Sequence, residues 1–270
     1  MKNLTATCII ALSTFPALVN AQQISPRTTN GGDIGLQISD YKFEADRDGV
    51  FDKSREGKKI GLTGSFNQAL ENNWYWGGDA RYASGNTVFT SATRGTNSAN
   101  PESYLDMRIT VGKDLEFWGN VLSPYTGFGH RTLTDDTSNY TDTGRIVYRE
   151  KSVYLYVPIG LTHRFRLGSQ SRFSTSVEYD YLLEGTQISY WTNIVGYTSD
   201  LYTTQRKGFG GRLSFAYETV TWSATLFYHY WNIQDSDLGN YTDSLLNIYS
   251  DITPHNITKE VGVQIKFRFN

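Results

Sequence analysis

Cysteine is almost missing from this chain, since Cys8 is the only one in 270 residues. Disulfide bonds therefore cannot hold the fold together, which excludes the small disulfide-rich secreted domains. Proline is also scarce, with six residues, so few positions interrupt a β-strand. No charge of one sign dominates: 25 lysines and arginines face 27 aspartates and glutamates. Without a basic surplus, we expect no nucleic-acid partner.

Long apolar runs are missing too. A helix that spans a membrane needs roughly 20 consecutive apolar residues, and no such run follows residue 21. The mean hydropathy of -0.45 would ordinarily indicate a soluble protein. Strands of a membrane barrel, however, alternate apolar and polar residues, so window averages hide their lipid-facing side. An aromatic content of 14%, with 19 tyrosines, favours such a barrel.

The first 21 residues have the pattern of a secretory signal peptide. Lys2 precedes an apolar run from Cys8 to Val19, and Val19 and Ala21 stand at the small-residue positions before a cleavage site. We therefore expect a signal peptide over residues 1–21 and one mature domain over residues 22–270. Cys8 would be removed with the signal, which leaves an exported domain without cysteine.

The last eleven residues, EVGVQIKFRFN, show the clearest periodicity of the chain. Apolar and aromatic residues alternate strictly with polar residues or glycine, which predicts a strand with one face in hydrocarbon and the other in water. A terminal strand of this kind needs a partner strand and an apolar surround. The apolar positions are Val261, Val263, Ile265, Phe267 and Phe269.

This terminal segment resembles the C-terminal signal of bacterial outer-membrane β-barrels. Glu260, Gly262, Ile265 and Phe267 meet the pattern, and Phe269 is penultimate because Asn270 follows it. In that family the segment is read by the barrel-insertion machinery. The resemblance implies an integral protein of the outer membrane of a Gram-negative bacterium. Its expected partners are outer-membrane lipids, lipopolysaccharide and the insertion machinery.

Nine further segments alternate in the same way, which predicts an all-β, up-and-down antiparallel barrel of ten strands, with eight or twelve as alternatives. Tight turns and long polar loops alternate between the strands, so we expect the turns and both termini in the periplasm and the loops outside. Two of the predicted loops cover residues 44–58 and 85–102. The predicted strands cover about 33–43, 58–68, 74–84, 103–112, 121–132, 151–166, 172–183, 208–218, 222–231 and 260–270.

Some residues do not fit this strand pattern. Tyr41 and Phe43 have the wrong parity for the lipid face, and a bulge near Asp40 would restore them to it. Pro124 and Pro158 lie inside strands of a barrel that has no edge, so we predict local bulges there. Outward aromatics fall into two groups, near the turns and near the loops, as in the aromatic belts of membrane proteins.

The inward positions collect charges of both signs. A barrel of ten strands is narrow enough for side chains to meet across it, so an ion-pair network can fill the interior. The same residues could instead line a narrow porin-like channel for small solutes. The predicted network comprises Asp79, Arg81, Asp106, Arg108, Arg131, Glu178, Asp180, Arg212, His229, Glu260, Lys266 and Arg268.

Two patterns raise the alternative of an outer-membrane hydrolase. Asp180 and His229 are predicted near the outer ends of their strands, where an acid and a histidine could activate water. Chain size and strand number resemble the omptin proteases, although no paired-acid motif is present and His229 lacks an aspartate two residues before it. His130 and Thr132 resemble the His-any-Ser motif of the lipid A deacylases, with threonine in place of serine.

The loops contain acidic clusters without the spacing of a calcium loop, so we expect no metal and no cofactor. They also contain Tyr190, Trp191, Tyr197, Tyr202 and Tyr241, which we expect to pack together or contact a ligand. The stretches LSPYTGFGHR, YLYVPIGLTHRFRLG and EYDYLL resemble the porin-like and surface-antigen group of outer-membrane barrels. The resulting hypothesis is a non-enzymatic surface barrel whose loops contact an unidentified extracellular ligand.

Overall fold

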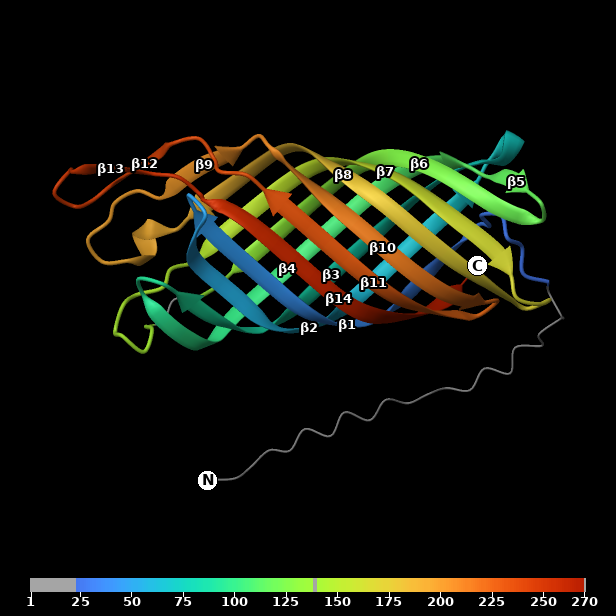
Figure 1. Cartoon of the computed structure of the whole chain (residues 1–270), viewed down its shortest axis with the longest axis horizontal. Helices are drawn as coiled ribbons and strands as arrows, with labels where there is room; N and C mark the ends of the chain where they lie inside the picture. Colours follow the sequence, from blue (N-terminus) through green and yellow to red (C-terminus); the bar gives the residue numbers. More distant parts are fainter. Residues whose placement is uncertain (1–22, 138–139, 270) are drawn as a thin grey trace, which may run out of the picture.

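A computed structural model describes residues 23–137 and 140–269. Residues 1–22, and with them the predicted signal peptide, lie outside this part of the chain. The described residues form an antiparallel barrel of ten long strands, as the sequence predicted (Figure 1). These strands are β1 (Gly31–Arg47), β2 (Val50–Ala69), β3 (Trp74–Ser91), β4 (Gly95–Lys113), β6 (Asn120–Asp135), β7 (Glu150–Arg166), β8 (Ser171–Ser189), β10 (Gly208–Thr219), β11 (Trp222–Ile233) and β14 (His255–Phe269).

Four shorter strands and two single-turn helices complete the structure. Strand β5 (Leu115–Phe117) forms a hairpin with β6, and β9 (Leu201–Gln205) pairs with the far end of β8. Strands β12 (Gly239–Thr242) and β13 (Ile248–Asp251) form a separate hairpin. The 3-10 helices are Glu71–Asn73 and Trp191–Asn193. No helix in the described ranges is long and apolar enough to cross a membrane.

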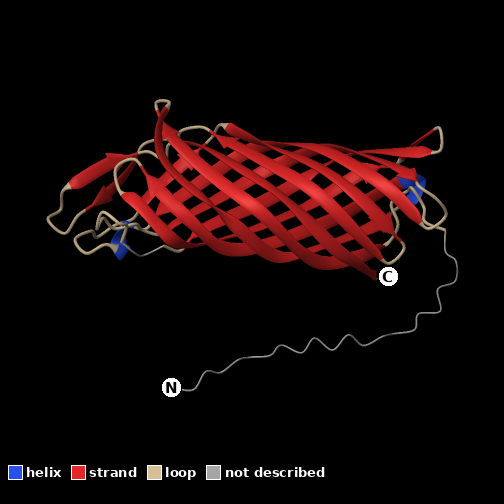
Figure 2. Cartoon of the chain, turned by 60° about the horizontal axis from the view of Figure 1, so that its bottom comes forward, coloured by secondary structure: helices blue, strands red, loops and turns tan. Residues whose placement is uncertain are grey.

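The first and last barrel strands close the sheet. β1 pairs with β14 in one unbroken register, from Gly32 opposite Phe269 to Asp46 opposite His255. All strands run obliquely around the barrel axis (Figure 2). Closure leaves no free edge, so neighbouring strands pair most backbone donors and acceptors within the wall.

Side chains sort between the two faces as the two-residue period requires. Apolar residues such as Leu36, Ile60, Phe128, Val177 and Ile265 are exposed on the outside. Aromatic pairs lie at both ends of this apolar band, for example Phe66 with Trp76 and Tyr179 with Phe209. The wall therefore has the lipid-facing surface of a transmembrane barrel.

The two ends of the barrel differ. The end that we call the turn end carries Gly31, Phe269 and the tight connections 70–73, 114–119, 167–170 and 220–221. The opposite end, the loop end, carries β9, the β12–β13 hairpin and the segment between β6 and β7 (Figure 1).

Two predicted loops are wrong. Residues 44–58 and 85–102 belong to strands, which turn only at Asp48–Gly49 and at Ala92–Arg94. A membrane strand needs about 9–11 residues, whereas β1 has 17 and β2 has 20. The hairpins therefore continue past the apolar band, where the outer face becomes polar. The sequence period disappears there because polar and charged side chains occupy both faces: Arg55 and Glu102 point inward and are buried, while Lys58 is exposed outside.

Two of the predicted bulges are also absent. No register shift occurs near Asp40, and Tyr41 and Phe43 point into the barrel, where they are buried. Pro124 lies in regular register opposite Leu161. Near Pro158 the pairing of β7 with β6 has a gap, between Ile159 opposite Thr126 and Tyr156 opposite Gly129. The nearest register shift between β7 and β8 follows Leu155. Pro158 has no backbone N–H to donate, and the wall accommodates it by leaving it unpaired with β6.

Candidate functional site

The centre of the barrel is filled by a cluster around Asp106 on β4, whose carboxylate is only 2% exposed. Its oxygens lie 3.1 Å from Arg212 on β10 and 3.4 Å from Arg131 on β6. Tyr156 on β7 donates a hydrogen bond to Asp106 at 2.7 Å and accepts one from Arg212 at 2.6 Å. Since β4 and β10 are four strands apart in a wall of ten, these contacts reach across the lumen.

A second carboxylate, Glu260 on β14, adjoins this cluster. It accepts hydrogen bonds from Tyr104 at 2.6 Å and from Ser39 at 2.7 Å, and Arg81 lies 3.4 Å away. Tyr104, Tyr156, Arg131, Glu260 and Trp231 all rank among the largest fully buried side chains. We call Tyr104, Asp106, Arg131, Tyr156, Arg212, Trp231 and Glu260 the central plug, because they are buried and include the contacts that join opposite sides of the described barrel.

Another ion cluster lies between the plug and the loop end. Arg55 contacts Asp135 at 2.5 Å and Glu150 at 3.0 Å, and Lys53 contacts Glu150 at 2.5 Å. Lys59 lies 3.3 Å from Glu102. The sequence prediction missed this cluster, because most of its residues lie beyond the predicted strand ends, in segments predicted to be loops. Continuing the inward alternation of β2, β4 and β6 toward the loop end would have found Arg55, Glu102 and Asp135.

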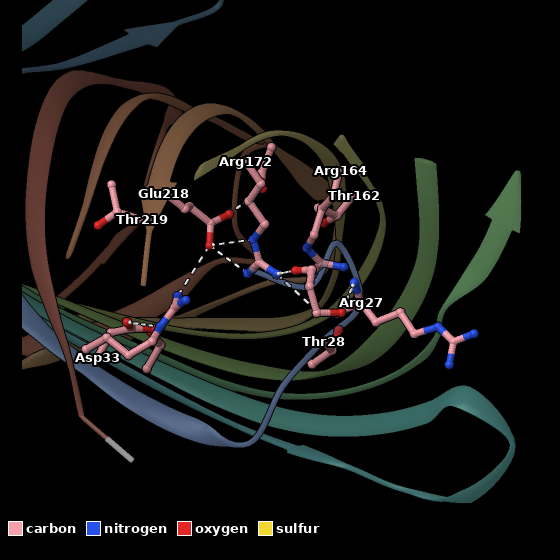
Figure 3. A network of polar contacts seen from close by, with 12 residues as sticks. Arg27, Thr28, Asp33, Thr162, Arg164, Arg172, Glu218 and Thr219 are labelled. Atoms are coloured by element: carbon pink, nitrogen blue, oxygen red, sulfur yellow. Dashed lines mark hydrogen bonds and ion pairs between the residues drawn. The ribbon is translucent and has the colours of Figure 1, made fainter. Parts of the chain in front are cut away.

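A cavity of about 260 Å³ lies between the plug and the turn end. Its wall carries Arg81, Arg108, Arg212, Lys266 and many hydroxyl side chains. At its lower rim Arg172 contacts Glu218 at 2.7 Å, and Arg268 contacts Glu218 at 3.3 Å (Figure 3). We call this cavity the lower chamber.

The segment before β1 crosses the turn end beneath the lower chamber (Figure 3). Arg172 donates hydrogen bonds to the carbonyl oxygens of Ser25 at 2.6 Å and Arg27 at 3.0 Å. The backbone amide of Thr28 donates to Asp114 at 2.6 Å. Ile24, Pro26 and Thr28 are buried, so residues 23–30 form a fixed cap at this end.

All residues of the predicted network point into the barrel, but they do not form one site. Asp106, Arg131, Arg212 and Glu260 meet in the plug, while Arg108 bridges Asp79 and Glu178. The remaining members face the lower chamber or its roof: Arg81, Asp180, His229, Lys266 and Arg268. The sequence prediction missed five charged residues at strand ends and turns: Asp33, Asp114, Arg164, Arg172 and Glu218. The alternation of the strands places Arg164, Arg172 and Glu218 on the inward face, so these three could have been found.

The predicted pair of Asp180 and His229 is not brought together. Asp180 is fully buried and bonds to Arg212 at 2.8 Å, and the Nδ1 atom of His229 lies 3.9 Å from Glu260. Both lie deep in the interior instead of at the outer mouth, because β8 continues to Ser189 and the β1–β2 hairpin extends through the predicted loop 44–58. Neither can reach an external substrate.

The other hydrolase pattern has no partner group either. His130 and Thr132 lie on the outer face, as expected, and are half-buried. The Nδ1 atom of His130 has no hydrogen-bond partner among the described residues. The described residues also contain no group of three or more histidine, cysteine or acidic side chains arranged to hold a metal ion.

Aromatic side chains from three connections pack together at the loop end. Trp191 stacks on Tyr241 with ring centroids 4.7 Å apart and an interplanar angle of 4°, and it contacts Tyr148 at 4.3 Å and Tyr197 at 5.0 Å. Tyr249 stacks on Tyr241 at 5.5 Å. Of the five aromatics that the sequence predicted to cluster, Trp191, Tyr197 and Tyr241 do so. Tyr202 is exposed elsewhere, and Tyr190 packs under Arg149.

The β12–β13 hairpin projects from this aromatic cluster. Its turn is held by Asp243, which accepts hydrogen bonds from the Asn247 side chain, from two backbone amides and from Tyr249. These bonds, above all the one from Asn247, hold the pKa of the Asp243 carboxyl below its usual range. At the tip, Leu245 and Leu246 are each 80% exposed and Ile248 is 72% exposed.

The barrel is similar in fold to the outer membrane protease OmpT of Escherichia coli. The TM-score is 0.57 at 12% sequence identity, over 91% of this chain and all of that chain. Weaker matches include the β domain of the Bordetella autotransporter BrkA, with TM-score 0.40, 12% identity and coverage of 89% of this chain and 100% of that chain. The Pseudomonas putida toluene transporter TodX gives TM-score 0.33 and 8% identity over 89% and 90% of the two chains.

At such low identity the similarity to OmpT shows the fold alone. No protein-family model and no curated protein sequence matches the chain. The chain therefore has the fold of the bacterial outer-membrane β-barrels, at the size of an omptin.

Proposed function

We propose that this outer-membrane-type barrel is a non-enzymatic surface protein, closed across its lumen, whose loop end binds an extracellular protein. The observation that carries the proposal is the apolar tip of the β12–β13 hairpin, formed by Leu245, Leu246 and Ile248. Three large aliphatic side chains within four residues at such exposure favour a protein contact. Val195, fully exposed on the neighbouring loop, extends the same surface.

The structure under the tip supports this role. Trp191, Tyr197, Tyr241 and Tyr249 fix the base of the hairpin, and Asp243 fixes its turn. A tip held in one conformation loses less conformational entropy on binding than a flexible loop. The base packs on the aromatic cluster, and the aliphatic residues of the tip point away from it into solvent.

The orientation in the membrane belongs to the same proposal. Long loops outside and tight turns inside are the usual arrangement of outer-membrane barrels. The loop end of this chain would then face the exterior, and Gly31 and Phe269 would lie at the periplasmic side. Outer-membrane lipids and lipopolysaccharide would contact the apolar band. Gly262, Ile265, Phe267 and Phe269 would act in insertion of the barrel.

The central plug favours a closed barrel over a narrow channel. Hydrogen bonds and ion pairs join Asp106 to Arg212, and Tyr104 to Glu260, each between strands four apart. A channel would require these contacts to separate and to leave buried charges unpaired, which is costly. Purified protein in planar bilayers should therefore give no steady single-channel steps. Steady steps that change with Arg131→Ala would contradict the closed barrel and favour the channel.

Site-specific photocrosslinking in cells tests the binding proposal. A photoreactive residue at position 246 should form discrete adducts with a partner protein under the conditions of natural exposure. The same residue at position 140 is the matched control, because Tyr140 is 67% exposed in a different loop of the same end. Adducts at 246 that disappear with the Leu245→Ser, Ile248→Ser double substitution support the proposal. Equal labelling at 140 and 246, or none, would refute it.

A further inference from the structure

The lower chamber, with a volume of about 260 Å³, has a cationic wall. Seven lysine and arginine side chains line it, against only three carboxylates, Asp33, Asp79 and Glu218. Most of the arginines also contact acids outside the chamber, such as Glu178, Asp180 and Asp114. Only some of these cationic groups therefore keep hydrogen-bond donors available inside the chamber.

One row of cross-strand neighbours supplies these donors. Lys266 on β14 lies opposite Gly35 on β1, Gly35 lies opposite Thr63 on β2, and Thr63 lies opposite Arg81 on β3. All four have inward parity, and Gly35 has no side chain. The row therefore places an ammonium and a guanidinium on either side of a hydroxyl, and the β14 backbone packs against Gly35, where a Cβ would overlap the Ile265 carbonyl oxygen. Such a row forms a concave polar wall.

Both cations in this row have unused hydrogen-bonding capacity. The Lys266 ammonium donates to the Ser65 hydroxyl at 3.2 Å and makes no ion pair among the described residues. Arg81 is only 4% exposed, and its Nε and Nη1 atoms have no hydrogen-bond partner. Its Nη2 atom is 3.4 Å from Glu260 and 3.7 Å from Asp106, which are long contacts for ion pairs. Leaving buried cationic donors unpaired is costly, so a ligand that accepts from them is favoured.

From this geometry we infer that the lower chamber binds a small oxyanion, of the phosphate or dicarboxylate class, between Lys266 and Arg81. Nine serine and threonine side chains line the chamber and supply further donors of the kind that oxyanions accept. Its volume of about 260 Å³ corresponds to roughly eight or nine water molecules at ~30 Å³ each. An anion of a few heavy atoms with part of its hydration fits this space, whereas a polymer does not.

The way in lies at the turn end. The central plug closes the chamber on the loop side, so an anion must pass the cap of residues 23–30. Arg172 holds the cap through the carbonyl oxygens of Ser25 and Arg27 (Figure 3). Weakening these two hydrogen bonds should speed exchange of the ligand. The binding site itself lies above them and does not depend on the loop end.

Calorimetric titration of the purified full-length barrel in detergent tests the inference. Inorganic phosphate and succinate are the two probes, and they distinguish the two ligand classes. Saturable binding of at least one probe is expected in the wild type. Lys266→Gln should weaken it roughly ten- to a hundredfold, the range for a hydrogen bond to a charged group. Lys259→Gln is the matched control, because Lys259 lies on the same strand but is exposed on the outer face.

Thermal unfolding gives a second readout of the same variants. The bound probe should raise the unfolding temperature of the wild type and of Lys259→Gln, but not of Lys266→Gln. Among the described residues Lys266 makes one hydrogen bond, to Ser65, and no ion pair, so the variant is expected to fold, and its heat-modifiable gel mobility checks this directly. Absence of saturable binding of both probes would overturn the inference. Equal affinity of wild type and folded Lys266→Gln would overturn it as well.

Discussion

Replacement of Asp106 by asparagine should destabilise the barrel more than any other single removal of charge in its wall. Asp106 lies near three guanidinium groups, those of Arg212, Arg131 and Arg81, at 3.1, 3.4 and 3.7 Å. Asparagine has nearly the same shape and can still accept the hydrogen bond from Tyr156. The substitution therefore removes the charge and little else.

The size of this loss depends on which ion pairs the three arginines keep after the substitution. Arg212 keeps its contacts with Asp180 and Glu178, whereas Arg131 has no other ion pair among the described residues. Breaking a buried pair and leaving one charge uncompensated costs about 3–5 kcal/mol. We expect about 3 kcal/mol, near the lower limit, because Arg131 also packs over the rings of Tyr104 and Trp231.

Urea unfolding of the barrel in lipid vesicles, followed by tryptophan fluorescence, measures this free energy. Asp136→Asn is the matched control, since Asp136 forms an exposed ion pair with Arg149 at the loop end. That pair should contribute no more than about 1 kcal/mol. Comparing the two substitutions separates the effect of burial from the chemistry of the replacement itself.

A double substitution makes the test stricter. Asp106→Asn combined with Arg131→Met removes the uncompensated cation, so it should recover at least about 1 kcal/mol of the loss. If Asp106→Asn changes the free energy of unfolding no more than Asp136→Asn does, the plug is not held by charge. Additive effects of the two substitutions would likewise refute the ion-pair explanation.

Three further predictions concern packing, assembly and pH. Gly129→Ala should destabilise the barrel by about 1–3 kcal/mol in the same unfolding assay, because a methyl group there would lie 2.0 Å from the Tyr156 ring. Gly64→Ala should be neutral, because a methyl group at that position would lie 3.6 Å from its nearest neighbour. Phe267→Ala with Phe269→Ala should slow barrel assembly by the insertion machinery, and a rate equal to that of Phe215→Ala would contradict an insertion signal. The lowered pKa of Asp243 stabilises the β12–β13 turn above the ordinary carboxyl pKa of about 4 and loses this effect as the pH falls below it. Trp191 fluorescence should report that loss, and the transition should be missing in Asp243→Asn.

Much of the barrel wall could be predicted from the order of residues alone. Strand number, strand faces and the lipid-facing residues follow from a two-residue period that each strand carries locally, as in Val261, Val263 and Ile265. The inward positions of Asp106, Arg212 and Glu260 follow from the same parity. Tyr41 and Phe43 were misplaced because an aromatic ring suits both lipid and a packed interior. Only the register of β1 with β2 and β14 decides between them.

The pairing of charges could not be predicted in this way. Arg55 lies 3.0 Å from Glu150 although their strands are four apart, and the hairpins that bring them inside look like loops in the sequence, because polar and charged side chains occupy both of their faces. The cap over the lower chamber depends on Arg172 reaching the backbone of Ser25, 147 residues away. Periodicity specifies the direction of a side chain, but not its partner across the lumen.

The sequence by itself determined a closed antiparallel wall with hydrocarbon outside and charges inside, because alternation is a local property that each strand expresses independently. The tertiary structure decided that these charges form a plug and leave a cationic chamber below it. It also decided that the loop aromatics support an apolar tip. Strand tilt and register set these distances, and both arise only when ten separate segments close around one another.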